Sequence, residues 1–442
     1  MVFLKENKLL TVIIAGSFVL SLFYAFYFRI TPVVDAKAYD RIAWNLVQGN
    51  GFRENAETPF RYDWAMLRAG PGYEFLLAGV YFVFGHRFEP VWVLQALLHA
   101  LTALLVYAIA RELFAQNGRQ AGLLAAAAIA ISPDLIEISA MLMTETLYVF
   151  CTALAVYLFL RQFRPGTGLL GALSVGTAVG VGILTRPTLV LFIPIMVFFY
   201  LSRKKYVAAV MLAVCSGLIL LPWVLRNYLL FNQIITTTLI GSYNIWLGNT
   251  LFSDGGQYNS TVNPLISYVT EHGLEGLKKH ASGEFMTFLL SHPLVFIKLC
   301  AIRVVRYFSL LRPMGFWFYQ VGVGKIAMVG SSLVWIAALF ISGFAGLAKL
   351  VREKNQTGYF FVALALSAPL LLFLTAVQSR YRFQIYPFLA VSGAGLIVAW
   401  WQQRRIAWKE SYFVFPVLFL LVISTVDLLS SVPVILAHLK LF

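Results

Sequence analysis

Long apolar runs are the feature that most constrains how this chain folds. A helix needs about 20 mostly apolar residues to cross the hydrocarbon core of a bilayer. The 442-residue chain is 60% hydrophobic and only 12% charged, with a mean hydropathy of +0.79, so it has too few polar side chains to cover a water-soluble surface. The sequence therefore predicts an all-α polytopic membrane protein with about eleven transmembrane helices, near residues 9–28, 91–110, 120–137, 139–160, 169–185, 187–201, 207–225, 326–348, 359–377, 384–401 and 411–430.

Lysine and arginine are concentrated in the short loops on one side of these predicted spans. Such loops lie at 111–119, 161–164, 203–205 and 349–354. Because cytoplasmic loops are enriched in basic residues, we expect a multi-pass protein of the cell (inner) membrane with a cytoplasmic N-terminus. The same rule accounts for the net charge of +15 without a nucleic-acid partner. We expect a single domain, 1–442, with extracytoplasmic segments at about 29–90 and 226–325.

Two further apolar stretches bear on this topology. The stretch at 72–85 is short for a span. The stretch at 293–311 places Lys298, Arg303 and Arg306 on one helical face, within an arc of about 140°. A basic face of this kind is typical of a helix that lies in the membrane interface. We therefore expect both stretches to lie on the outer surface.

The first outer segment is rich in carboxylates. It contains Asp35, Asp40, Glu54, Glu57, Asp63, Glu74 and Glu89. Pro32 ends the first apolar run, and Asp35 begins a second predicted helix at the outer edge of the membrane. Two interpretations of Asp35 follow from its position: it caps that helix, or it is the catalytic carboxylate of a site on the outer face.

Four arginines lie at the outer ends of predicted spans: Arg186, Arg226, Arg380 and Arg382. The enrichment of basic residues in cytoplasmic loops does not account for arginines at these positions. A charge at the edge of the membrane is by default a candidate functional group. The planar guanidinium stays charged and binds phosphate oxygens in a bidentate way, so convergence of these side chains would suit a phosphate or diphosphate. Each of them could instead extend to lipid headgroups or pair with a carboxylate such as Glu145, which lies near the start of the fourth span.

Several motifs, taken in order, resemble those of the GT-C class of polyprenyl-phosphate-sugar-dependent glycosyltransferases, which includes protein O-mannosyltransferases and the lipid A aminoarabinose transferase. The motifs are D-A-K-A-Y-D-R at 35–41, R-A-G-P-G-Y at 68–73, G-H-R-F-E-P at 85–90, L-T-R-P-T at 184–188, L-P-W-V-L-R-N-Y at 221–228, G-S-Y-N-I-W-L-G-N-T at 241–250 and S-R-Y-R-F-Q-I-Y-P at 379–387. The family has R-P-P-G-Y-P where this chain has Ala69, Gly70 and Glu74, and a second acidic residue where Ala36 follows Asp35.

The resemblance implies a GT-C fold of about a dozen helices, with interfacial helices in the first outer loop. It implies that Asp35 is the general base. From the residues themselves we expect the four outer arginines to bind the donor phosphate, supported by the residues Glu145, Tyr39, Arg68 and Tyr381. The expected partners are membrane lipids, a polyprenyl-phosphate-linked sugar and an acceptor glycan, lipid or protein. The sequence requires no cofactor and shows no metal motif, and it leaves a divalent metal open.

The resulting hypothesis is a hexosyl- or pentosyltransferase that moves a sugar from the lipid phosphate to an acceptor hydroxyl on the extracytoplasmic face. A single base without a second carboxylate as nucleophile predicts inversion at the anomeric carbon, by analogy with inverting glycosidases. One alternative is a transporter or flippase for an anionic lipid-linked solute, although the chain shows no inverted repeat. Another alternative is a non-catalytic membrane scaffold.

Overall fold

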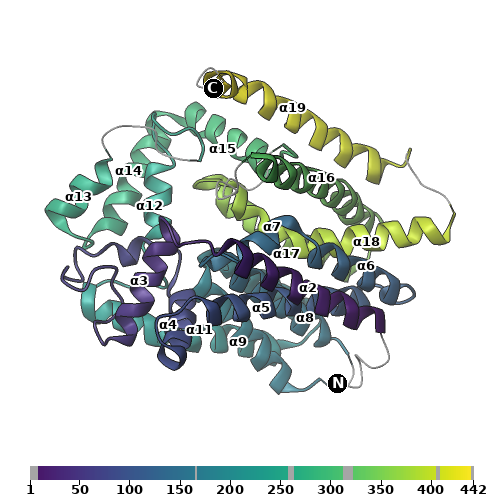
Figure 1. Cartoon of the computed structure of the whole chain (residues 1–442), viewed down its shortest axis with the longest axis horizontal. Helices are drawn as coiled ribbons and strands as arrows, with labels where there is room; N and C mark the ends of the chain where they lie inside the picture. The colour runs from purple at the N-terminus through teal and green to yellow at the C-terminus, as the bar shows by residue number, and fades with distance from the viewer. Residues whose placement is uncertain (1–7, 165–166, 257–262, 312–321, 405–408, 440–442) are drawn as a thin grey trace.

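The computed structural model describes residues 8–164, 167–256, 263–311, 322–404 and 409–439, and every regular element in these ranges is helical (Figure 1). The helices of the main bundle are α2 (Lys8–Phe28), α5 (Glu89–Leu113), α6 (Gly118–Ala130), α7 (Pro133–Ser139), α8 (Thr144–Arg161), α9 (Leu169–Thr185), η2 (Pro187–Leu191), α10 (Phe192–Ser202), α11 (Tyr206–Phe231), α16 (Gly322–Arg352), α17 (Gln356–Leu374), η4 (Ser379–Ile385), α18 (Tyr386–Gln402) and α19 (Ser411–Leu439). The two long connecting segments contain α3 (Asp35–Val47), η1 (Trp64–Leu67), α4 (Pro71–Phe84), α12 (Ile240–Leu247), α13 (Pro264–His272), α14 (Leu277–Ser291) and α15 (Pro293–Phe308).

Eight helices in the described ranges are long and apolar enough to cross a membrane, which makes the chain a multi-pass membrane protein. They are α2, α5, α8, α11, α16, α17, η4 with α18, and α19. Two bent pairs raise the number to ten if each is one span: α6 with α7, bent by 55°, and α14 with α15, bent by 106°. Helices α9 and α10, which occupy two of the predicted spans, are shorter. The all-α membrane fold is thus confirmed, whereas the count of eleven stays a prediction.

Glycines allow a close helix contact in the bundle, where α16 crosses α18. A Cβ atom added at Gly346 would lie 2.2 Å from the Ser392 carbonyl oxygen, and one added at Gly393 would lie 2.6 Å from the Ser342 Oγ. The Ser392 hydroxyl in turn donates to the Gly343 carbonyl oxygen at 2.9 Å. Small residues of this kind let two membrane helices approach at backbone distance, which fixes α18, and the η4 segment before it, against the bundle.

Replacing Gly346 by valine is expected to prevent this approach. The added side chain would overlap backbone atoms of α18, which cannot move aside as the end of a side chain can, so we expect a loss of several degrees in melting temperature. Thermal unfolding of the purified variant in detergent measures it. Gly330→Val on the same helix is the matched control, because no atom lies within 4 Å of a Cβ placed there. Equal melting temperatures for the two variants would contradict this packing.

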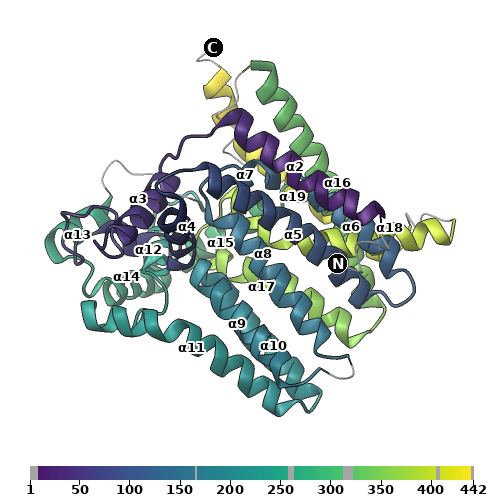
Figure 2. The same ribbon diagram turned by 60° about the horizontal axis from the view of Figure 1, so that its bottom comes forward.

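The two long connecting segments come together at one end of the bundle (Figures 1 and 2). Residues 257–262 and 312–321 of the second segment lie outside the described ranges. A separate hydrophobic cluster joins the segments and includes Phe52, Trp223, Leu239, Trp246 and Leu265. The backbone of Leu239 also donates to the Met66 carbonyl oxygen at 2.7 Å. This packing holds α3, η1 and α4 over the ends of α8, α9 and η4.

Candidate functional site

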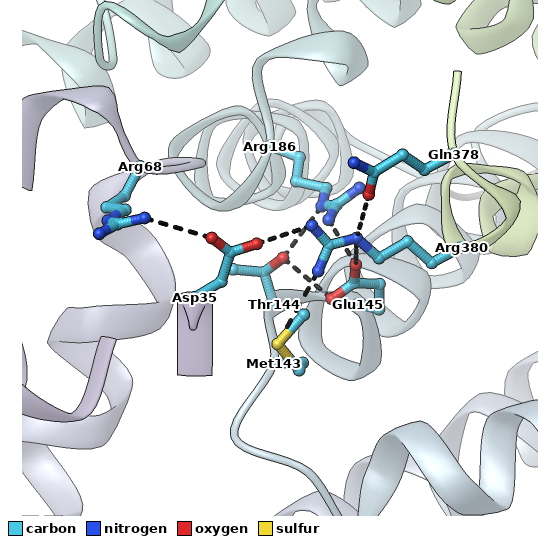
Figure 3. A network of polar contacts seen from close by, with 8 residues as sticks. All are labelled: Asp35, Arg68, Met143, Thr144, Glu145, Arg186, Gln378 and Arg380. Carbon is cyan, nitrogen blue, oxygen red and sulfur yellow. Dashed lines mark hydrogen bonds and ion pairs between the residues drawn. The ribbon is translucent and has the colours of Figure 1, made fainter. Parts of the chain in front are cut away.

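Asp35 is the first residue of α3, and its carboxylate is held between two arginines from distant parts of the chain (Figure 3). Arg68 Nη1 donates to Oδ1 at 3.2 Å, and Arg380 Nη2 donates to Oδ2 at 2.7 Å. The N-cap position of α3 belongs to Val34 and has no side-chain cap, so the Asp35 carboxylate is directed at the guanidinium groups and not at the helix terminus. The side chain remains 27% exposed, which leaves it accessible to a substrate.

Arg380 connects Asp35 to a second carboxylate, that of Glu145. Its Nε lies 3.5 Å from Glu145 Oε1 and donates to Gln378 Oε1 at 3.1 Å. Glu145 lies in the first turn of α8 and is 1% exposed, and Arg380 is 7% exposed. Because an isolated buried charge is unfavourable, each of these two groups is stabilised by its oppositely charged partners.

Arg186 is the other partner of Glu145. Located between α9 and η2, it donates from Nη2 to Glu145 Oε1 at 2.5 Å and from Nε to the Thr144 hydroxyl at 3.0 Å. Together with Arg68 and its partner Glu54, the side chains form a chain of alternating charge. In order, it consists of Glu54, Arg68, Asp35, Arg380, Glu145 and Arg186. We call this set the charged chain; three negative and three positive groups give it no net charge.

Asp63 organises the loop that positions Arg68. It is 3% exposed, and its carboxylate accepts hydrogen bonds from the backbone N–H groups of Glu54, Asn55 and Ala65 at 2.8, 2.9 and 2.9 Å. The loop thereby brings Glu54 beside Arg68, whose Nη2 donates to Glu54 Oε2 at 2.7 Å. The loop thus fixes the orientation of the Arg68 side chain beside Asp35.

The arginines control the protonation state of Asp35. Burial acts to raise the pKa of Asp35, but the charges of Arg380, Arg68 and Arg186 outweigh it, and the pKa lies below its usual value. The charged form of Arg68 is favoured as well. Burial acts to lower the pKa of Arg68, but the Glu54 carboxylate outweighs burial, and the pKa lies above its usual value. Asp35 is therefore an anion whenever its arginine partners are in place.

Three tyrosines surround the charged chain. Tyr39 lies one turn after Asp35 on α3 and is buried, and the pKa of Tyr39 is raised by burial and by the Asp35 charge. The ring of Tyr381 lies between two arginines, 5.2 Å from the guanidinium of Arg186 and 5.7 Å from that of Arg380. The half-buried Tyr243 of α12 comes from the second long connecting segment. The pKa of Tyr243 is raised by burial and by the charges of Tyr381 and Asp35. These rings place apolar surface and hydroxyl groups beside the charged chain.

Comparisons with known proteins agree with this architecture. A family model described as dolichyl-phosphate-mannose-protein mannosyltransferase matches residues 68–230. A search of curated protein sequences gave no match. Among solved structures, the archaeal oligosaccharyltransferase AglB from Archaeoglobus fulgidus, in complex with an inhibitory peptide and a dolichol-phosphate, aligns with a TM-score of 0.55 at 18% identity, covering 95% of this chain and 54% of that chain. ArnT from Cupriavidus metallidurans in the apo state aligns with a TM-score of 0.52 at 15% identity, covering 89% of this chain and 61% of that chain.

The chain has the GT-C fold. The resemblance predicted from the sequence motifs is confirmed at this level. The present chain spans about half the length of the archaeal GT-C protein and about three-fifths of ArnT, as the covered shares of 54% and 61% state. At these identities the similarity concerns the arrangement of helices, and the chemistry of the site has to be argued from its own residues.

Two of the four arginines predicted to bind phosphate lie away from the charged chain. Arg226 packs against aromatic rings, with its guanidinium 4.7 Å from the Trp223 ring and 5.3 Å from the Phe60 ring. Arg382 is fully buried on the other side of η4, where Nη1 donates to the Ser309 carbonyl oxygen at 2.7 Å. The structure thus brings Arg186 and Arg380 together, and does not bring Arg226 or Arg382 to them.

Several residues of the site were not singled out from the sequence. Thr144, Gln378 and Tyr243 contribute polar groups, and Met143 places its sulfur 4.0 Å from Arg380 Nη1. Sequence signals were present for two of them: Thr144 directly precedes Glu145 in T-E-T, and Tyr243 lies in the G-S-Y-N-I-W motif. Gln378 and Met143 join the charged chain only through the folding of η4 and of the turn before α8.

The carboxylates of this site do not fit a resident divalent metal. Within the part of the chain that the structure describes, no group of three or more His, Cys, Asp or Glu side chains is placed to hold a metal ion. The carboxylates of Asp35 and Glu145 each face two guanidinium groups, whose charges would repel a cation. Another structure of the Archaeoglobus fulgidus oligosaccharyltransferase, in complex with Zn and sulfate, aligns with a TM-score of 0.53 at 17% identity, covering 93% of this chain and 51% of that chain.

Glu74 is a second unusual carboxylate of the first long connecting segment. It lies in the first turn of α4, is fully buried, and neither of its oxygens has a hydrogen-bond partner among the described residues. Burial raises the pKa of Glu74 to about 8, although its own backbone N–H and the charge of Arg68 act in the opposite direction. The folded protein therefore keeps this carboxyl protonated at neutral pH.

This pKa predicts that stability falls with rising pH. Below the ordinary pKa of a glutamate both folded and unfolded states are protonated; between that value and about 8 only the unfolded state releases the proton, so each pH unit costs up to about 1.4 kcal/mol. Glu74→Gln removes this dependence, and we expect its melting temperature, relative to the unsubstituted protein, to be higher at pH 9 than at pH 5. The exposed Glu57→Gln is the control. A constant difference between pH 5 and pH 9 would refute the buried protonated carboxyl.

Proposed function

We propose that the protein is a membrane glycosyltransferase that transfers a sugar from a polyprenyl-phosphate donor to an acceptor hydroxyl on the extracytoplasmic face. The observation that carries this proposal is Asp35 held between Arg68 and Arg380 at 3.2 and 2.7 Å, at the end of the bundle where the two outer segments meet. A carboxylate and several guanidinium groups at one membrane edge supply both functions that the reaction needs. These are a base for the acceptor and cations for the phosphate.

The charge of the site explains how a donor would bind. The charged chain has no net charge, so a donor phosphodiester adds one negative charge. Arg380 and Arg186 are the cations best placed to receive it, because Arg380 already divides its N–H groups between Asp35 and Glu145. As Arg380 turns to the phosphate, Asp35 loses its strongest cationic partner. Its pKa then rises, and the carboxylate becomes a better proton acceptor.

The chemical step balances in protons and electrons. The acceptor oxygen attacks the anomeric carbon while its proton passes to Asp35. The bond between the anomeric carbon and the phosphate oxygen breaks, and its electron pair stays on the departing polyprenyl phosphate. The arginines stabilise the second negative charge that develops on this phosphate. Attack opposite to the leaving group, without a covalent sugar-enzyme intermediate, inverts the anomeric carbon.

The comparisons support the donor class. The matching family model is described by a dolichyl-phosphate-mannose donor, and the aligned AglB structure holds a dolichol-phosphate and an inhibitory peptide. By analogy, the donor here is a sugar on a polyprenyl phosphate, and the acceptor is a protein, a glycan or a lipid. The proposed topology has a cytoplasmic N-terminus and the active site on the opposite face, in one domain whose outer segments cover the site.

The test is product formation. Purified protein in vesicles is supplied with a radiolabelled polyprenyl-phosphate sugar and a membrane extract as the source of acceptor. We expect label to move from the lipid donor to a new product, with release of polyprenyl phosphate. Movement of intact labelled donor across sealed vesicles, without any product, would overturn the proposal in favour of the flippase alternative.

A further inference from the structure

A cavity of about 540 Å³ lies at the end of the bundle opposite to the charged chain. It is enclosed by the turn between α5 and α6, the end of α8 and the start of α17. Helix α8 runs from Thr144, in the site, to Arg161, next to the cavity wall, and its 18 residues span about 27 Å at 1.5 Å per residue. That distance is close to the thickness of the hydrocarbon core, so the cavity opens at the other membrane surface. The predicted topology makes this the cytoplasmic surface.

Arginines from three separate segments line the cavity: Arg111 at the end of α5, Arg119 at the start of α6 and Arg164 after α8. Glu112 is the only carboxylate in the lining, and Arg164 Nε donates to it at 2.7 Å. In the part of the chain that the structure describes, Arg119 has no ion-pair partner. Three arginines and one glutamate give the lining residues a formal excess of two positive charges, so its preferred occupant is an anion.

The apolar part of the lining distinguishes a lipid from a soluble anion. Phe114, Leu160 and Phe163 contribute to the same walls as the arginines. Basic groups beside aromatic and aliphatic side chains, at the level where a bilayer changes from headgroup to acyl chain, match a lipid that has a phosphate headgroup. A soluble phosphate has no apolar part that could contact Phe114, Leu160 and Phe163.

We propose that this cavity is a binding site for the phosphodiester headgroup of an anionic phospholipid of the cytoplasmic leaflet, separate from the proposed sugar-transfer site. The enrichment of cytoplasmic loops in basic residues explains why arginines occur on this face. It does not explain why three of them converge on one cavity. The basic residues 203–205, on the same predicted face, serve that rule without lining the cavity.

The experiment measures phosphatidylglycerol bound to the purified full-length protein by native mass spectrometry, with phosphatidylcholine as the zwitterionic reference. Arg111→Gln with Arg119→Gln removes two charges from the lining, and about 1 kcal/mol per basic residue predicts about a thirtyfold loss of affinity. Ala115→Trp fills the cavity without changing its charge and is expected to reduce binding as well. Arg203→Gln with Lys204→Gln is the matched control, with the same loss of charge on another loop of this face.

The outcomes separate the alternatives. Loss of phosphatidylglycerol binding in both cavity variants, with binding unchanged in the control, supports the site. Equal losses in the cavity and control variants would reduce the effect to diffuse attraction by a basic face and overturn the proposal. Competition by inorganic phosphate at equal affinity would make the occupant a soluble anion and also overturn it. If the double variant does not fold, Ala115→Trp decides alone, because its substitution lies on an exposed residue.

Discussion

Asp35→Asn is expected to reduce sugar transfer by about 10²- to 10⁴-fold, the range that a general base contributes. Asparagine keeps the size of the side chain but cannot accept the proton of the acceptor hydroxyl. The substitution also removes a competitor for the arginines, since Arg68 and Arg380 each donate to the Asp35 carboxylate. Donor affinity should therefore be retained or increased while transfer is lost. Transfer rates and donor binding, measured separately on the purified variant, test both parts.

Measuring both the transfer rate and donor binding of Asp35→Asn distinguishes a catalytic base from a structural ion pair. If Asp35 only held Arg68 and Arg380 in place, its loss would weaken donor binding and stability together. Glu54→Gln is the matched control, because it removes the other carboxylate bound to Arg68, at 2.7 Å, and leaves Asp35 intact. We expect a smaller loss of transfer there. Transfer by Asp35→Asn near the level of the unsubstituted protein would exclude Asp35 as the base.

The sequence carried enough information for the membrane fold and for the position of Asp35. Apolar runs predict helices reliably because every backbone group inside a bilayer has to be hydrogen-bonded within its own helix. Each of the eleven predicted segments contains a helix, and the predicted span at 120–137 is a pair of helices bent by 55°. Hydropathy measures length and composition but not bending, so it cannot separate a continuous span from a broken one.

The partners of Asp35 could not be read from the sequence. Arg68 and Arg380 lie 33 and 345 residues away from it, and only the folding of the first long connecting segment over η4 brings the three together. Outer-edge position selected Arg226 and Arg382 by the same reasoning as Arg186 and Arg380. Position at the outer end of a predicted span indicates how deep an arginine lies in the membrane. It does not indicate in which direction around the helix axis the side chain points.

Arg382 illustrates the missing information. In an α-helix, residues two apart point about 160° apart, whereas in a 3₁₀ helix, with three residues per turn, they point about 120° apart. The S-R-Y-R segment forms the 3₁₀ helix η4, so Arg380 reaches Asp35 while Arg382 turns to Ser309 at the end of α15. Either geometry separates the two side chains. Whether Arg380 or Arg382 faces the charged chain depends on how α18 packs, and this packing is set by the glycine contacts between α18 and α16.

Arg380→Gln is expected to lower kcat/KM for the donor by about 10²- to 10³-fold, as the loss of one preorganised charge-stabilising group does in other enzymes. Arg380 makes the shortest contact to Asp35, at 2.7 Å, and is the strongest of the charges that lower the Asp35 pKa. Without it the pKa of Asp35 rises, and a larger fraction of the free enzyme carries a protonated, inactive base at low pH. The acidic limb of the kcat/KM profile should therefore move to higher pH.

Two further variants make this test specific. Arg380→Lys keeps the charge but cannot bridge Asp35 and Glu145 with one planar group, so its loss of kcat/KM should lie between those of the unsubstituted protein and Arg380→Gln. Arg382→Gln removes an arginine two residues along the same segment that makes no contact with the Asp35 carboxylate, and its acidic limb should not move. An equal shift in Arg380→Gln and Arg382→Gln would mean that the pH dependence follows the overall charge of η4. Arg380 would then have no direct role in holding Asp35 ionised.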